Sequence, residues 1–205
     1  MRKFTKKQAM FMAQIREMHC QQNMDNMFLY FTAPILRGAK PASLFTLNPH
    51  CLSFWHERQN ALRKATGLRT LEIVNQRGAV LLFSYDESAL RVLLQDIRAM
   101  ALLARYGYPA GRDPREMLRY LRRRFSNSGF PHEIGVFLGY PADDVWSFIA
   151  NGGKNYICCL YWKVYHNVER AREIFNRIDE AQRYAVDLLS SPIPIHTAIN
   201  MFKAG

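Results

Sequence analysis

The 205-residue chain contains no long apolar run. Its hydrophobic stretches all fall short of the roughly 18 residues that a membrane-spanning helix needs, so we expect a soluble protein without a membrane span. A secretory signal is also missing, because the basic start is followed by Gln8, Gln14, Arg16 and Glu17 instead of an apolar segment. We therefore expect a cytoplasmic location.

Cysteine is scarce, and its spacing fits neither a redox motif nor a zinc site. The four cysteines include no C-x-x-C pair and no set with zinc-ligand spacing. Two of them, Cys158 and Cys159, are adjacent and would point to opposite faces of a strand. The sequence favours reduced thiols in a cytoplasmic protein and predicts no metal site.

Several catalytic signatures are absent as well. The chain has no H-E-x-x-H motif, no G-x-S-x-G nucleophile elbow and no dinucleotide-binding glycine fingerprint. The run Gly152-Gly153-Lys154-Asn155 resembles a phosphate loop, but it follows an expected helix and precedes an expected strand, which reverses the phosphate-loop order. We interpret it as a turn that stops a helix.

The composition is that of a basic, folded protein. Hydrophobic residues make up 49% of the chain, which is enough for a core. Lysine and arginine number 28 against 17 aspartate and glutamate residues, for a net charge of +11. This balance permits binding to nucleic acid, to an anionic membrane or to an acidic protein, without requiring any of them.

The length suits a single domain over residues 1–205. We expect an N-terminal helical extension over 1–40, then an α/β core over 41–165 that holds a helical insert over 106–153, and C-terminal helices over 166–205.

The order of expected elements predicts an α+β fold with a ferredoxin-like β-α-β-β-α-β antiparallel sheet, extra N-terminal helices and a helical insert before the last strand. Residues 23–26 are expected to end the first helix, and residues 28–36 to form a short helix or an extended piece. The other expected helices cover 6–22, 51–66, 87–105, 113–125, 131–138, 141–150, 168–189 and a short tail after Pro192, and the strands cover 41–47, 68–74, 79–85 and 155–165.

Residues 130–141 concentrate proline, glycine and aromatic residues around a His-Glu pair. Imidazole can act as acid, base or metal ligand near neutral pH, so His132 and Glu133 are candidate catalytic residues. Neighbouring side chains project to different sides of a helix, so folding would have to bring in other groups, with Lys163 as a third catalytic candidate and Lys154 and Tyr165 as ligand-binding candidates. The alternative is structural, with His132 hydrogen-bonded at a helix start and Glu133 near the helix dipole.

A second candidate is a row of arginines on the helix expected over 113–125. Arg115, Arg119, Arg122 and Arg123 share a face opposite an apolar stripe. Guanidinium groups in such a row can bind phosphates or an acidic protein, and the alternative is an ordinary solvated helix face. The aromatic residues over 156–165 could stack on bases, but no second strand repeats the pattern, which favours core packing.

The chain resembles the bacterial family catalogued as domain of unknown function 3793. The resemblance implies no established activity, cofactor or catalytic residue, and it implies an iron or redox context. Members commonly carry cysteines where this chain has Thr32 and residues 176–184, so no thiol role carries over. The matching pieces are Ala33-Pro34, Lys40 to Phe45, Phe130 to Val145, Phe148-Ile149, Asn151, Gly153, Lys154 and Trp162 to Tyr165.

Three functions are consistent with these features. The leading hypothesis is a non-enzymatic accessory or binding module in iron or redox physiology, acting with an acidic redox protein such as a flavodoxin or with a small anionic ligand. A second is an enzyme that uses His132 and Glu133 with a lysine, which requires His132 in a concave pocket within hydrogen-bond reach of another titratable group. A third is nucleic-acid binding through residues 112–124. The identity of any cofactor stays open.

Overall fold

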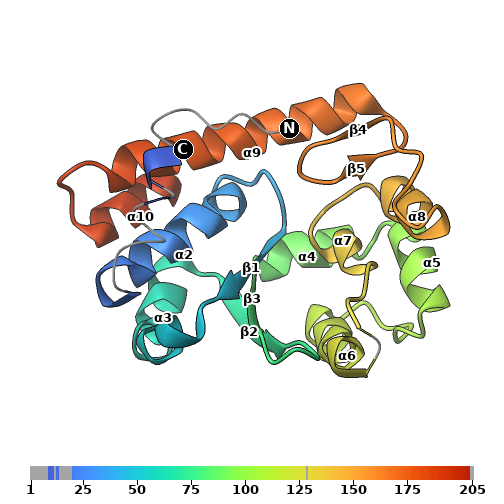
Figure 1. Ribbon diagram of the computed structural model, residues 1–205, viewed down its shortest axis with the longest axis horizontal. Helices are drawn as coiled ribbons and strands as arrows, with labels where there is room; N and C mark the ends of the chain where they lie inside the picture. Colours follow the sequence, from blue (N-terminus) through green and yellow to red (C-terminus); the bar gives the residue numbers. More distant parts are fainter. Residues whose placement is uncertain (1–8, 12, 14–19, 128, 204–205) are drawn as a thin grey trace.

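The computed structural model describes residues 9–11, 13, 20–127 and 129–203 (Figure 1). At its centre lies a three-stranded antiparallel sheet of β1 (Ala42–Leu47), β2 (Arg69–Val74) and β3 (Val80–Tyr85) in the order β1-β3-β2. A tight turn joins β2 to β3, with Gly78 at φ 74°. The apolar strand β3 is central, as expected for a strand that is buried on both faces.

The two faces of the sheet carry different helices. On one face, Phe45 and Leu82 pack with α2 (Cys20–Leu36) and α3 (Leu52–Thr66), which follows η1 (Pro49–Cys51). On the other face, Leu81 and Phe83 pack with α4 (Glu87–Leu93), α6 (Pro114–Asn127) and α7 (Ile134–Phe137). Alternation along β3 therefore feeds two separate apolar cores.

The remaining helices enclose this centre. Helix α5 (Ile97–Arg105) lies beside α8 (Ala142–Ala150), and the long α9 (Val168–Leu189) runs along α2 with α10 (Ile195–Lys203) next to it (Figure 1). Asn167 caps α9 by accepting a hydrogen bond from the Arg170 amide at 2.9 Å. A small ribbon of β4 (Cys158–Cys159) and β5 (Lys163–Val164) sits under the start of α9.

Three local expectations were wrong. Residues 87–105 form two helices because the Asp96 carboxylate caps a new one, accepting from Arg98 N at 2.8 Å and Ala99 N at 3.0 Å. Residues 23–26 lie inside α2 instead of ending a helix. For residues 28–36 the helical alternative is confirmed, with Pro34 in the last turn of α2. The helix expected over 6–22 falls largely outside the described residues. Cys51 is disulfide-bonded, so reduced thiols are not found at that position.

An α+β fold is observed, whereas the ferredoxin-like topology is not confirmed. Residues 155–165 form a hairpin that pairs with itself instead of one strand that joins the sheet, with Ile157 N donating to Val164 O at 2.8 Å. The physical reason is that Trp162 and Val164 pack with Phe175 in a small core of their own. This packing holds the ribbon against α9 and away from the central sheet.

The turn after α7 lies against the residue that precedes β1. Gly139 in this turn has a φ of 80°, and a Cβ placed there would collide with the Pro41 ring. Gly38 also has a positive φ, of 62°, but it faces open space. Both positions favour glycine because of their backbone conformation. At Gly139 there is also no room for a side chain, whereas at Gly38 there is.

We expect Gly139→Ala to destabilise the protein more than Gly38→Ala does. Each change forces alanine into the left-handed region at about 1–2 kcal/mol, and the collision with Pro41 adds about 1–3 kcal/mol. Urea unfolding of the two variants measures the difference. Equal losses would show that the contact between Gly139 and Pro41 does not constrain the fold.

Lys40 lies between α2 and β1, and among the described residues nothing accepts a hydrogen bond from its ammonium group. Burial lowers its pKa to about 8. The unfolded chain should titrate near the ordinary lysine value of about 10.4, so the folded state disfavours the charged form.

We expect the cost of charged Lys40 to be present in full below pH 8 and to fade as the pH rises toward about 10.4. The free energy of unfolding of the natural protein should therefore increase relative to that of the Lys40→Met variant as the pH rises across this interval. Urea unfolding at several pH values tests it, and a stability difference that is constant over the interval would contradict it.

Candidate functional site

A cavity of about 340 Å³ opens between α7, α8 and the β4–β5 ribbon. Its wall is mostly aromatic and aliphatic, with few polar groups. The Tyr140 ring stacks on Trp162 with 4.7 Å between centroids, and burial raises the pKa of Tyr140 to about 12. The lining residues are Phe130, His132, Ile134, Gly135, Leu138, Tyr140, Asp144, Val145, Phe148, Cys159, Tyr161, Trp162 and Lys163.

His132 lies on the wall of this cavity. Its side chain is exposed, and its ring contacts Phe148 edge-on with 5.0 Å between centroids and lies 5.8 Å from Phe130. Within the described part of the chain, no group hydrogen-bonds the imidazole. The pocket that the enzyme hypothesis requires is therefore present, and the titratable partner is not found.

Glu133 points away from the cavity into the protein. Only 1% of it is exposed, and its carboxylate accepts hydrogen bonds from Arg124 Nε at 2.9 Å and from the Tyr108 hydroxyl at 3.2 Å. Burial, followed by the Glu133 charge, raises the pKa of Tyr108. The structure thus separates His132 from Glu133, as expected for neighbours at a helix start, and Glu133 braces α7 against α6.

Lys163 brings a positive charge to the cavity. Its Nζ donates a hydrogen bond to Gly153 O at 2.6 Å and lies 4.8 Å from the Tyr156 ring centroid and 5.7 Å from that of Phe148. An ammonium group has three donors, and among the described residues the Gly153 carbonyl is the acceptor for one of them. Two donors remain for a ligand.

The glycine turn after α8 positions that carbonyl. Gly152 and Gly153 have φ values of 56° and 73°, and Gly153 N bonds Phe148 O at 2.8 Å. The turn ends α8, as the sequence predicted. A side chain at Gly153 would press on Phe148 and on the Lys163 ammonium group, so glycine also keeps this side of the cavity open.

Asp144 holds the ribbon in place. Its buried carboxylate accepts hydrogen bonds from Trp162 Nε1 at 2.8 Å, Tyr165 N at 2.9 Å and His166 N at 3.1 Å. Nothing in the sequence indicated this role, because the partners of Asp144 lie about 20 residues further along the chain. With these bonds made, the carboxylate is a structural group rather than a ligand for a cation.

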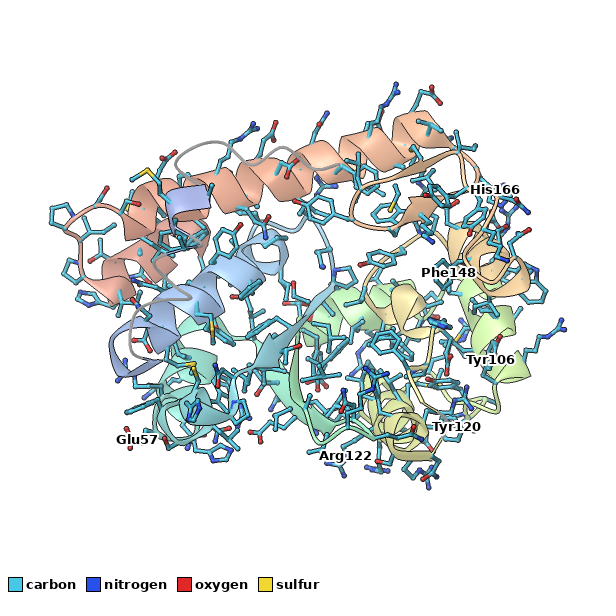
Figure 2. All side chains as sticks on the ribbon, in the orientation of Figure 1. Glu57, Tyr106, Tyr120, Arg122, Phe148 and His166 are labelled. Carbon is cyan, nitrogen blue, oxygen red and sulfur yellow. The ribbon has the colours of Figure 1, made fainter. Side chains whose placement is uncertain are left out.

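Two other sequence candidates lie away from the cavity wall. Lys154 is exposed in the glycine turn, and Tyr165 donates its backbone amide to Asp144 while its hydroxyl is buried without a hydrogen-bond partner. A contact missed from the sequence joins Ser147 Oγ to His166 Nε2 at 2.8 Å. His166 lies on the outer side of the molecule near α8 and the ribbon, whereas Phe148 lies between α7 and the ribbon (Figure 2).

The four arginines of the α6 row have different surroundings. Arg115 pairs with Glu87 at 3.2 Å, and the Arg123 guanidinium lies 5.3 Å from the Tyr120 ring centroid. Arg119 and Arg122 have no ion pair or hydrogen bond among the described residues. Together with Arg115 they line a second hollow of about 200 Å³, whose other lining residues are Thr70, Leu71, Tyr85 and Leu118.

The described ranges contain neither a metal-binding cluster nor a helix that could span a membrane. No group of three or more His, Cys, Asp or Glu side chains there could hold a metal ion. No helix in that part of the chain combines the length and apolarity that crossing a bilayer needs.

Comparison with known proteins gives one match. A family model described as "Protein of unknown function (DUF3793)" matches residues 28–198. The matched segment includes the cavity, the arginine row and the ribbon. No curated protein and no solved structure matches the chain.

We expect Asp144→Asn to destabilise the protein by about 3 kcal/mol, since an amide cannot reproduce hydrogen bonds to a buried charged acceptor. The neighbouring Asp143→Asn is the matched control, because Asp143 is exposed and pairs with Arg98 at the surface. Its effect should stay within about 0.5 kcal/mol. Urea unfolding compares them, and similar losses would contradict a special role for Asp144.

Proposed function

The chain belongs to the DUF3793 family of proteins of unknown function, and we propose that it is a non-enzymatic binding module for a small anionic ligand with a planar ring. The ligand occupies the cavity between α7, α8 and the β4–β5 ribbon. One observation carries this proposal: an aromatic cavity is joined to a lysine ammonium group with unused donors.

The cavity supports a ligand with a flat apolar part. Its volume of about 340 Å³ lies within the range of small-molecule sites. Phe130, Phe148 and Tyr161 line it together with the stacked pair of Tyr140 and Trp162. Aromatic walls favour planar rings, which can stack or pack edge-on against them.

The charges support an anionic group on that ligand. Lys163 offers two donors, and the His132 imidazole, which lines the same cavity, has no hydrogen-bond partner among the described residues. Asp144, the carboxylate in the wall, is already engaged by three N–H donors. A carboxylate or phosphate would bind Lys163 strongly here, because apolar surroundings screen charges less than water does.

The same geometry favours binding over catalysis. General acid–base chemistry needs a proton acceptor or donor oriented for its task, whereas His132 lacks an orienting partner in the described part of the structure and Glu133 is turned toward Arg124. The iron or redox context stays a prediction. Flavin mononucleotide and haem, which combine planar rings with anionic groups, are therefore natural probes.

We expect calorimetric titration to detect binding of an aromatic carboxylate such as indole-3-carboxylate, of flavin mononucleotide or of haem. Lys163→Met should weaken binding of the responding anion about tenfold or more, since a charge-assisted hydrogen bond is lost. Lys154→Met removes the same charge from an exposed lysine outside the cavity. The affinity of this control variant for the same anion should stay within about twofold of that of the natural protein.

An uncharged analogue separates the ring from the charge. The methyl ester of the carboxylate should bind more weakly to the natural protein and should be insensitive to Lys163→Met. Failure of all three ligand classes to bind, or equal weakening by the two lysine substitutions, would overturn the proposal.

A further inference from the structure

Strand β2 has a free edge. The sheet order β1-β3-β2 leaves β2 paired with β3 on one side, and no other described strand pairs with it. Asn75 N donates to Ala79 O at 3.0 Å, which fixes the alternation of the ladder. In an antiparallel pair, Thr70, Glu72 and Val74 then direct their N–H and C=O groups away from β3. Such a row is a ready template for an added strand.

On one face of this edge lies a strongly positive hollow. Arg119 and Arg122 of α6 line it beside Thr70 and Leu71 of β2. Neither arginine has an ion pair in the described structure. Figure 2 shows the labelled Arg122 on the outer side of the molecule, next to the boundary between β2 and α6. Acidic groups brought there would find guanidinium donors that are not yet engaged.

The other face of the edge already holds a carboxylate and a guanidinium group, with Arg63 Nε donating a hydrogen bond to Thr70 Oγ1 at 2.6 Å. Glu72 points there and accepts hydrogen bonds from Trp55 Nε1 at 2.8 Å and His56 Nε2 at 3.1 Å. Val74 follows on the same face and is 54% exposed. Like charges directly opposite each other destabilise a strand pair. An added strand therefore needs uncharged, apolar side chains on the face of Glu72 and acidic ones on the face of Arg119 and Arg122.

We propose that the β2 edge binds an extended acidic segment of a partner protein as an added antiparallel strand. Every second residue of the segment is acidic and faces Arg119 and Arg122, and the residues between are apolar and face Val74. The strand's own backbone bonds to the outward groups of Thr70, Glu72 and Val74. This surface is separate from the cavity and does not depend on the proposed ligand.

The observations favour a protein segment over nucleic acid. A row of alternating N–H and C=O groups matches a peptide backbone, which nucleic acid does not have. Binding of single strands also relies on exposed rings for base stacking, and Tyr85, the ring in this hollow, is only 7% exposed.

The test uses the full chain and a short synthetic peptide in which Glu and Val alternate, with fluorescence anisotropy at about 0.15 M salt as the readout. Arg122→Glu should weaken binding about tenfold or more, because repulsion replaces attraction. Arg123→Glu is the matched control: it changes the net charge equally on the neighbouring residue, and affinity should stay within about twofold. Amide hydrogen exchange at Thr70, Glu72 and Val74 should slow when the peptide binds.

Backbone methylation of the peptide tests strand addition without changing the protein. In an antiparallel added strand, the Val amides point toward β2 and the Glu amides point away. N-methylation of the Val residues should abolish binding, and N-methylation of the Glu residues should preserve it. The proposal would be overturned if the two methylated peptides bound equally, or if methylation of the Glu residues were the one that abolished binding. It would also be overturned if a peptide with all its Glu residues in one block bound as tightly as the alternating peptide. Tighter, Arg122-dependent binding of an oligothymidylate would assign the surface to nucleic acid instead.

Discussion

The buried carboxylate of Asp144 organises the cavity between α7, α8 and the β4–β5 ribbon. By accepting hydrogen bonds from the Trp162 ring and from two consecutive backbone amides, it attaches a short hairpin to the first turn of α8. The attached ribbon supplies one wall of the cavity, and it holds Lys163 over the turn that ends the same helix. A two-stranded ribbon this short has little stability of its own, so the cavity depends on this attachment and on the packing of Trp162 against Phe175.

Acidic and basic residues differ in their surroundings at the cavity and at the β2 edge. Glu133 and Asp144 are buried and engaged by donors inside the protein, so their charges stabilise packing. Lys163, Arg119 and Arg122 keep donors that no described residue accepts from. With a net charge of +11, the chain has more cations than its own carboxylates can pair. The unpaired ones that lie beside a cavity or a strand edge are those suited to anionic partners.

Local signals in the sequence predicted much of the fold. The central strands and the long α9 follow from alternation and helical spacing. Several of the residues at 130–141 line the cavity together with the β4–β5 ribbon. Asp96 shows the limit of such signals, since an aspartate inside an apolar helical pattern starts a new helix only if the chain can turn there.

The sequence by itself determined the α+β class, most element positions, the positive charge and the region around His132, because these depend on contacts between residues close along the chain. Tertiary structure alone decided that residues 155–165 form a separate hairpin and that β2 keeps an open edge. It also decided that the His132 side chain lines the cavity while that of Glu133 is buried against Arg124. Those outcomes depend on partners such as Asp144, Arg124 and Phe175, which lie many residues away. No local pattern encodes which distant donor meets which buried carboxylate.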